Sequence, residues 1–509
     1  MGDLDPCFSL IINILILTHP PVPQSPSPPI PLPSPEYDLV IIGATAAART
    51  AAIEAVNRQA RVALVLPQSS AQFQSGFYPY ALAQIAKSSR LSRSPLQSPS
   101  SYPWQYAALA TERIEQQSSP ALLAAMGVDI IIGSGEFCRR PRLAFNINQR
   151  YLRARAYLIA TGSVANDSSI PGIQAVGYLT LVDLASLREN REIPLKWAII
   201  GSEAIGVELA QTLAKLGCQV KLIVETPQIL PYENLETAKL IQAQLEADGV
   251  QIYLSTIVQK VDREDTCKLV LIEAESIAVD EIFIALPDRP LLESLNLDGV
   301  GVDYTDQGIS INKKLQTSHR RIYACGSVCG NILGGYHGES LTQFEAKIAV
   351  KNILSWRKTK INYDSYNHLP WAIYTDPPLA RVGMNINTAI DSRRQDLVIL
   401  KQYLKDCPQS IIDNNNSGCC QIIATHKGQI LGAEIVGQNA PELIQILALA
   451  IQQKLKIVDL IAFPYLSPSY AESIYQTAQQ WSAFVNKKQG LKSSILRWIA
   501  IRMGFKSPS

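Results

Sequence analysis

Two stretches of the chain share one hydrophobic pattern: a short apolar run ends at a glycine turn, and an alanine-containing helical segment follows. The first run occupies residues 37–43, and the second begins at Trp197 and ends at Gly201. Continuous apolar runs of this length are typical of strands buried on both faces of a parallel sheet. The pattern therefore predicts two separate strand–turn–helix units.

Apolar periodicity extends both units along the chain. After the first turn we expect a helix to about Gln59, a strand at 60–66, a polar Ser-rich segment at 68–103, a helix at 105–126, and strands at 128–132 and 152–159. After the second turn we expect strands at 220–225, 251–254 and 281–285, a helix at 234–248, a buried strand from Ile322, and a helix at 341–356. Strands that alternate with helices indicate parallel sheets.

The pattern changes from Leu369 onward. Strands are expected at 373–374, 397–403, 418–425 and 430–436, and helices at 440–454 and 470–483. This order predicts a separate α+β domain. The predicted fold class is α/β, with two Rossmann-like dinucleotide-binding domains followed by an α+β C-terminal domain.

Composition excludes several classes of function. The 509 residues suffice for three domains, and a net charge of +2, from 46 basic and 44 acidic residues, argues against a nucleic-acid partner. Nine cysteines show no spacing typical of a zinc site or a disulfide framework. We therefore expect structural thiols, no metal site and a reducing, cytoplasmic setting.

Both ends of the chain differ from the rest. Residues 1–36 form an apolar and Pro-rich leader that we expect to be disordered, and its apolar stretch is too short to span a bilayer. Residues 486–509 form a basic tail with the pattern of an amphipathic helix. Such a helix fits either a peripheral contact with an anionic membrane or docking on the protein itself.

Several motifs recur in a fixed order along the chain. They are the turn at Gly43, Ala160-Thr-Gly-Ser163, the turn at Gly201, Tyr323-Ala-Cys-Gly-Ser327 and Tyr374-Thr-Asp-Pro-Pro-Leu-Ala-Arg-Val-Gly383. In this order the chain resembles the class I pyridine nucleotide-disulfide oxidoreductases, and within that family it looks like dihydrolipoamide dehydrogenase and mercuric reductase. The resemblance covers residues 37–483.

The resemblance implies a domain plan. An FAD-binding domain would comprise residues 37–178 and 287–357, interrupted by an NAD(P)-binding domain at 179–286. A dimerisation domain would follow at 365–485 and would complete each active site across a homodimer. The apolar helical stretch Leu443–Ile451 supports the dimer.

At the first turn the resemblance implies an FAD site with altered recognition residues. Gly43, Thr161, Gly162 and Gly326 match the family, whereas Thr45 and Ala48 replace glycines, Ser327 replaces an aspartate, and Leu66 replaces the acid that would hold the ribose. In the family a glycine at this position lets the pyrophosphate approach the backbone closely, and the side chain of Thr45 takes up that room. We therefore expect FAD, bound with reduced affinity.

At the second turn the pattern favours NADH. The helix that contains Gly206 would present backbone N–H groups to a diphosphate, and Glu225, 24 residues after Gly201, would accept hydrogen bonds from the ribose hydroxyls and repel a 2′-phosphate. Glu203 replaces the middle glycine and is expected to weaken binding. Glu208 matches the family's glutamate beside the nicotinamide. The plainer alternative is that Glu208 is an ordinary exposed helix residue without a role in binding.

The residues that carry out dithiol chemistry in the family are absent from this sequence. The chain has no cysteine between Cys7 and Cys138, and Ser75–Leu82 occupies the region where the family has its redox-active pair. In the family's His–Glu acid–base pair, Glu472 remains as a weak catalytic candidate, but Ser467 stands at the histidine position. Serine does not titrate near neutrality, so it cannot serve as the proton donor.

Two functions remain open from the sequence. The first is an FAD-linked, NADH-dependent oxidoreductase without dithiol chemistry that passes electrons from the flavin to an unknown small-molecule or protein acceptor. The second is a non-catalytic dimeric descendant of the family, acting as a scaffold or binding protein. A yellow protein that bleaches with NADH is expected only for the first.

Overall fold

The computed structural model describes residues 35–68, 76–91, 102–139, 142–166, 170–184, 187, 194–273, 275–330, 338–361, 366 and 368–483. Residues from Tyr37 onward form one compact unit. The predictions for the leader up to residue 34 and for the basic tail concern residues outside these ranges. No helix within them is long and apolar enough to cross a membrane.

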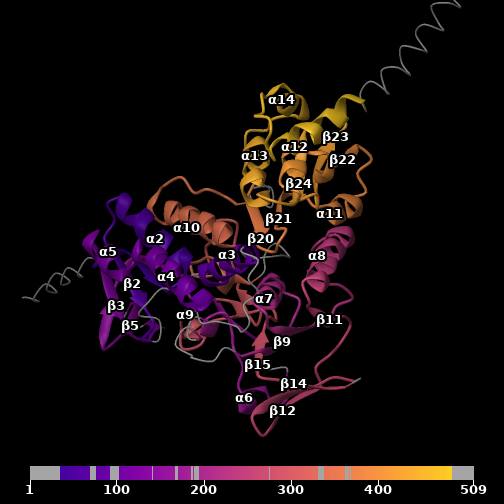
Figure 1. The fold of residues 1–509 in the computed structure, drawn as a ribbon. Coiled ribbons are helices and arrows are strands. Elements are labelled where there is room, and N and C mark those ends of the chain that lie inside the picture. Colours follow the sequence, from indigo (N-terminus) through magenta and orange to yellow (C-terminus); the bar gives the residue numbers. More distant parts are fainter. Residues whose placement is uncertain are drawn as a thin grey trace, which may run out of the picture. The chain divides into compact units, whose positions relative to one another are not determined.

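A five-stranded parallel sheet carries the first turn (Figure 1). Its order is β19-β7-β1-β2-β3, with β1 at Tyr37–Ile42, β2 at Val62–Leu66, β3 at Val128–Ile132, β7 at Ala154–Ile159 and β19 at Ile322–Ala324. Alternate residues of β1 point to opposite faces. Leu39 and Ile41 meet the helix face, where α2 (Ala46–Asn57) packs with α10 (Glu339–Leu354).

The other face of this sheet is covered by a small antiparallel sheet. Val40 and Ile42 of β1 share a core there with Phe137 and Phe145. The covering strands are β4 at Gly135–Cys138, β5 at Ala144–Ile147 and β6 at Arg150–Leu152. Burial on both faces explains why β1 reads as a continuous apolar run.

The second turn belongs to a four-stranded parallel sheet of order β11-β10-β9-β15. Its strands are β9 at Lys196–Ile200, β10 at Gln219–Ile223, β11 at Gln251–Tyr253 and β15 at Glu281–Ile284, with helices α7 at Ala204–Lys215 and α8 at Leu235–Ala247. An antiparallel sheet of β12 (Lys260–Glu264), β13 (Cys267–Leu271) and β14 (Ser276–Val279) adjoins it. Trp197 of β9 stacks on Trp104, with ring centroids 6.4 Å apart.

The C-terminal region is an antiparallel sheet of order β20-β21-β24-β23-β22. Its strands are β20 at Pro370–Ile373, β21 at Leu379–Gly383, β22 at Leu397–Tyr403, β23 at Cys419–Thr425 and β24 at Ile430–Val436. Helix α13 (Ala440–Gln452) and a helix at 472–483 pack on it. Together with the two parallel sheets, this confirms the predicted fold class.

The remaining helices and strands connect these layers. They are α3 at Phe77–Leu91, α4 at Tyr102–Gln116, α5 at Pro120–Ala125, α6 at Ile173–Val176, α9 at Leu297–Val300, α11 at Ile386–Asp391, α12 at Pro408–Ile412, α14 at Ile457–Ala462, η3 at Ser327–Cys329, η5 at Leu404–Asp406, β8 at Ser163–Val164, β16 at Arg289–Pro290, β17 at Tyr304–Thr305 and β18 at Gly308–Ile309.

Three local predictions were wrong. The expected helix at 105–126 is two helices, because Ser119 caps α5 and Pro120 occupies its first turn. The expected Ser-rich segment at 68–103 contains the helix α3. The strand expected to reach Glu225 ends at Ile223, so Glu225 lies beyond β10.

Candidate functional site

The first glycine turn lies where the carboxyl ends of β1 and β7 meet. Gly43 has φ +132°, and a Cβ on it would lie 2.1 Å from the carbonyl oxygen of Ala160. No other residue fits this conformation and this close approach. The turn directs the chain over the sheet edge into α2, whose first turn contains no acidic side chain. In a parallel sheet such an edge is where nucleotides bind.

Thr45 is the N-cap residue of α2. Its hydroxyl accepts a hydrogen bond from the N–H of Ala48 at 3.3 Å and donates one to the carbonyl oxygen of Ala160 at 2.9 Å. Its methyl group lies 2.7 Å from the position that a Cβ on Gly162 would occupy, and Ser327 Oγ lies 3.8 Å from the same position. The structure therefore brings Thr45, Gly162 and Ser327 together from three separate strand ends.

A buried carboxylate holds the neighbouring Gly326 turn. Glu345, on α10, is 1% exposed and accepts a hydrogen bond from the N–H of Gly326 at 2.8 Å and another from the hydroxyl of Tyr366 at 3.0 Å. Gly326 itself has φ +79°. Our sequence analysis missed Glu345, and its only sequence signal is an acidic residue among the apolar positions of α10. It fixes the loop that follows β19.

The remaining residues of the first site are arranged around the same edge. Ala48 is fully buried in α2, where its small side chain allows close packing on the sheet. Thr161 donates a hydrogen bond to the carbonyl oxygen of Leu291 at 2.8 Å. Leu66 is fully buried, so it offers no polar group at the end of β2.

The second glycine turn repeats the geometry of the first. Gly201 has φ +128°, and a Cβ on it would lie 2.0 Å from the carbonyl oxygen of Ala285. A Cβ on Gly206 would lie 2.6 Å from the Cβ of Ala285, so glycine allows α7 to pack closely on β15. These are the two structural roles that glycines have in a dinucleotide-binding turn.

Carboxylates surround the start of α7. Glu203 is its N-cap residue but makes no side-chain capping hydrogen bond. Burial, reinforced by the negative charge of Asp288, raises the pKa of Glu203. Asp288 accepts a hydrogen bond from Ser163 Oγ at 2.8 Å. Glu225 is exposed just beyond β10. A charged Glu203 would oppose an anionic ligand here, and its weakening of dinucleotide binding stays a prediction.

Glu208 is buried in the second turn of α7, and the prediction of an exposed helix residue, the plainer alternative, is wrong. It is 7% exposed, and its Oε1 accepts a hydrogen bond from the N–H of Tyr374 at 2.7 Å. Burial raises the pKa of Glu208 to about 7, although the Tyr374 N–H lowers it. Its place beside a nicotinamide stays a prediction.

The same face of α7 clamps the chain that follows β20. Gln211 accepts a hydrogen bond from the N–H of Asp376 at 2.7 Å and donates one to its carbonyl oxygen at 2.8 Å. Lys215 forms an ion pair with the Asp376 carboxylate. Because residues 208, 211 and 215 share one helix face, α7 holds residues 374–376 through the backbone at Tyr374 and Asp376 and through the Asp376 carboxylate.

The structure places the predicted acid–base residues at the C-terminal end of the described chain. Glu472 begins the helix at 472–483 and accepts a hydrogen bond from the N–H of Ser469 at 3.3 Å. Ser467 is exposed. The Glu472 carboxylate therefore serves as a local helix cap.

Helix α3 occupies the region where the sequence analysis places the missing dithiol. Its Tyr80 packs edge-to-face against Tyr374, with ring centroids 4.5 Å apart. All eight cysteines of the described residues are free thiols. Cys325 and Cys329 are buried, and burial raises the pKa of both well above the usual value. Thiols in such surroundings are poor nucleophiles.

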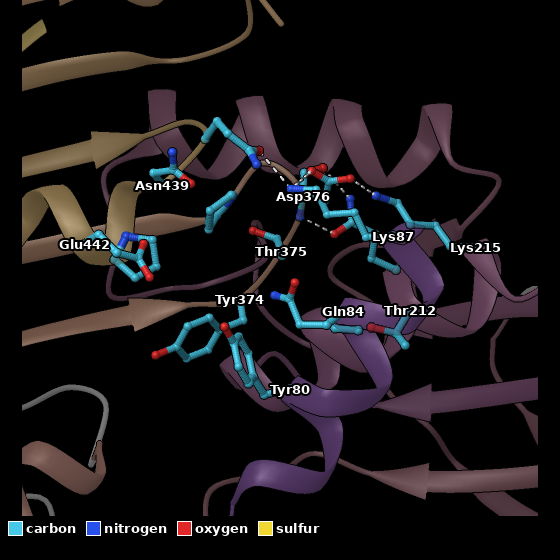
Figure 2. A pocket seen from close by; sticks show the side chains of 15 residues that line it. Tyr80, Gln84, Lys87, Thr212, Lys215, Tyr374, Thr375, Asp376, Asn439 and Glu442 are labelled. Carbon is cyan, nitrogen blue, oxygen red and sulfur yellow. Dashed lines mark hydrogen bonds and ion pairs between the residues drawn. The ribbon is translucent and has the colours of Figure 1, made fainter. Parts of the chain in front are cut away.

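A cavity of about 170 Å³ opens between α3, α7 and residues 374–376, the segment that α7 holds and that we call the clamped segment (Figure 2). Its polar lining includes Gln84 and Lys87 from α3, Thr212 and Lys215 from α7, and Asp376. None of these five residues was a candidate in the sequence analysis. They come from helices and a loop that the fold, and not the sequence order, brings together.

Comparison with known proteins identifies relatives along most of the chain. A family model described as pyridine nucleotide-disulphide oxidoreductase matches residues 37–348, and its dimerisation domain matches residues 369–478. Mercuric reductase of Staphylococcus aureus is 28% identical over 473 residues, which cover 89% of this chain and 84% of that protein.

Two further likenesses agree with these matches. Dihydrolipoyl dehydrogenase of Bacillus subtilis is 30% identical over 324 residues, which cover 62% of this chain and 68% of that protein. The structure of the HOCl-induced flavoprotein disulfide reductase RclA from Escherichia coli matches with a TM-score of 0.76 at 24% identity, covering 87% of this chain and 99% of that one. At this identity the structural likeness shows the fold alone.

Proposed function

Because the chain belongs to the pyridine nucleotide-disulphide oxidoreductase family, we propose that it is an FAD-linked, NADH-dependent oxidoreductase that passes electrons from the flavin directly to an acceptor. The observation that carries this proposal is a combination. Both dinucleotide-binding turns retain the glycine that follows the strand, Gly43 and Gly201, while the sequence has no cysteine between Cys7 and Cys138. Electrons in this protein would thus pass from the flavin to the acceptor without a dithiol as intermediate carrier.

The first turn fits FAD. Gly43, Gly162 and Gly326 all have φ between +79° and +132°, and they lie at the ends of the adjacent strands β1, β7 and β19. The start of α2 carries no acidic side chain, which favours a diphosphate there. Glu345 would hold the Gly326 loop in place, and the hydroxyl of Ser327 would offer a hydrogen bond to the cofactor.

The second turn fits the dinucleotide backbone, with one opposing charge. Gly201 allows the tight turn and Gly206 allows α7 to pack closely on β15, which are two of the three roles of glycine in such a turn. Exposed Glu225 would accept from the adenosine ribose, which favours NADH over NADPH. The carboxylate of Glu203 would weaken this binding unless it is protonated, because it stands at the helix end that attracts anions.

When bound, the two cofactors supply hydride transfer from nicotinamide to flavin, and the protein aligns them. The chain's own contribution is positional. The hydrogen bond from the Tyr374 N–H keeps the Glu208 carboxylate on a fixed face of α7, where the family resemblance places the nicotinamide. Acceptors that need no thiol, such as a quinone, a dye, oxygen or a small protein, are consistent with this arrangement.

One observation favours the second candidate, a non-catalytic dimeric scaffold or binding protein. The Thr45 side chain occupies the space between its own turn and Gly162, and its hydroxyl already satisfies the N–H of Ala48. Both features reduce what the helix end can offer to a pyrophosphate. The two candidates differ in a single property, flavin binding.

We further propose that the protein forms a homodimer through its dimerisation domain. Phe463 and Leu466 are 56% and 83% exposed in that domain, so they leave apolar surface available to a partner subunit. In the stretch Leu443–Ile451, α13 buries Leu443, Ile444 and Leu447 against its own sheet but leaves Leu449 57% exposed, so the contribution of this stretch to the dimer stays a prediction.

The visible absorbance spectrum of protein purified without added cofactor tests the proposal. Flavin bands that bleach on anaerobic addition of NADH are the expected result. A colourless protein that also fails to bind added FAD would contradict the proposal and leave the non-catalytic candidate.

A further inference from the structure

Four segments that are distant in sequence, one of them α7, form the walls of the cavity of about 170 Å³. Helix α3 contributes Tyr80, Gln84 and Lys87, which are spaced by four and three residues and therefore share one helix face. The clamped segment contributes Tyr374 to Asp376. The turn between β24 and α13 contributes Asn439, and the first turn of α13 contributes Glu442 (Figure 2).

The cavity is separate from the second glycine turn. On α7 it touches Gln211, Thr212 and Lys215, which follow Gly206 by five, six and nine residues. At a rise of 1.5 Å per residue they lie about 8, 9 and 14 Å farther along the helix. A ligand in the cavity would therefore occupy a different place from a diphosphate at the N-terminus of α7.

The basic end of the cavity is already neutralised. Lys87 lies 3.2 Å from the Asp376 carboxylate and donates a hydrogen bond to Gln438 Oε1 at 2.8 Å. Lys215 pairs with Asp376 and lies 3.7 Å from the buried carboxylate of Asp248. The two lysines are balanced by two aspartates, so this end does not attract an anion.

The opposite end combines aromatic rings with a carboxylate. Tyr80 and Tyr374 pack edge-to-face, with ring centroids 4.5 Å apart and an interplanar angle of 62°. Burial and then the negative charge of Glu442 raise the pKa of Tyr80, and Glu442 also contributes to the raised pKa of Tyr374, after burial and closer neighbours. Among the described residues, no basic side chain pairs with Glu442.

We propose that this end of the cavity, formed by Tyr80, Tyr374 and Glu442 and called the cleft below, binds a small organic ammonium ion. Tyrosine faces attract cations, and an adjacent carboxylate supplies the counter-charge. An ammonium group has three N–H donors, and the amide oxygens of Gln84 and Asn439 are acceptors in the same lining. The volume suits a molecule of about the size of benzene, so the ligand is a short primary amine.

Isothermal titration of the full-length protein with 1-butylammonium chloride at constant ionic strength tests the proposal. Matched titrations use 1-butanol, which has the same chain without the charge, and butyrate, which has the opposite charge. We expect saturable binding of the ammonium probe and at least tenfold weaker binding of both others. Equal binding of the three probes, or preferred binding of butyrate, would overturn the proposal.

Variants assign the binding to the cleft. Glu442→Gln keeps the size and polarity of the side chain but removes the charge, so we expect at least a tenfold loss of affinity for 1-butylammonium. Asp391→Asn removes an exposed carboxylate from α11 and should leave the affinity unchanged. Equal affinities of the Glu442→Gln variant and the parent protein would overturn the assignment, provided that thermal melts show both are folded.

A second probe distinguishes the source of the ammonium group. A lysine whose α-amino and α-carboxyl groups are both blocked presents the same ammonium charge, on its side chain, as part of a peptide-like molecule. If it binds as tightly as 1-butylammonium and loses affinity in Glu442→Gln, the cleft accepts lysine side chains of other proteins. If only 1-butylammonium binds, the ligand is a free amine. Either result supports an ammonium site, and failure of both probes would overturn it.

Discussion

The buried Glu208 carboxylate accepts a hydrogen bond of 2.7 Å from the backbone N–H of Tyr374, 166 residues away, and this bond attaches α7 to the end of β20. A carboxylate in this position carries a cost, because burial disfavours its charged form. The bond therefore links the protonation of one residue to the attachment of two structural regions.

Glu208 gives the stability of the protein a pH dependence of known sign. Its folded-state pKa of about 7 lies above the ordinary value of 4.5, so the native state binds the proton more tightly. Stability should be highest below about pH 4.5 as far as this group is concerned, and should decline as pH rises to about 7, by about 3 kcal/mol. Glu208→Gln should show a shallower decline in denaturant midpoints between these pH values.

Gln211→Ala is the matched control for Glu208→Gln. It removes two hydrogen bonds to the backbone of Asp376 and one to the Asp248 carboxylate, but it removes no titrating group. It should lower stability at every pH by about 2 kcal/mol and leave the slope as in the parent protein. A Glu208→Gln slope equal to that of the parent would contradict the linkage.

Thr45 should limit the affinity for FAD. Thr45→Ser removes the methyl group beside Gly162 but retains the capping hydroxyl, and Thr45→Gly removes both. We expect FAD to bind about tenfold more tightly to both variants, which corresponds to about 1.4 kcal/mol. Fluorescence quenching during FAD titration measures this. Weaker binding to Thr45→Ser than to the parent would contradict the steric explanation.

Glu203 should limit the affinity for NADH through its charge. Glu203→Gln removes a carboxylate at the N-terminus of α7, so NADH should bind about tenfold more tightly at neutral pH. Burial and Asp288 raise the pKa of Glu203. The gain in NADH affinity should therefore shrink as pH falls, because Glu203 of the parent protein becomes protonated. Glu225→Gln should act in the opposite direction, since it loses the ribose acceptor charge. An unchanged NADH affinity in Glu203→Gln would contradict the electrostatic account.

The proposed dimer depends on exposed apolar residues of the C-terminal domain. Leu466→Asp places a charge where 83% of the side chain is exposed, and it should convert a dimer into a monomer in sedimentation velocity experiments. Ile257→Asp, at a 57% exposed position of the second parallel-sheet region, should leave the sedimentation coefficient unchanged. A dimer that survives Leu466→Asp would place the interface elsewhere.

Local patterns were sufficient for the elements that depend on local chemistry. Strands β22 and β24 occur at the predicted residues, and both dinucleotide turns have the backbone that their glycines indicate. In contrast, α3 was hidden by its Ser-rich surroundings. Its helical face, with Tyr78, Leu82 and Ala86, is recognisable only when the core formed with the second parallel-sheet region is known.

Residues that act across long sequence separations could not be found in this way. Glu345 meets Gly326 only because α10 folds back over the first sheet, and the clamp on Asp376 joins two structural regions. No periodicity encodes these contacts. They depend on tertiary packing, which also places Lys87 of α3 beside Asp376.

The most direct test of the central claim is a count of electrons. A flavin alone accepts two electrons, which one NADH supplies, whereas a flavin coupled to a redox-active disulfide accepts four. Anaerobic titration of the purified protein with NADH, followed by absorbance to complete reduction, should end at one equivalent per bound flavin. An endpoint of two equivalents per flavin would reveal a second two-electron acceptor in the chain and contradict the account.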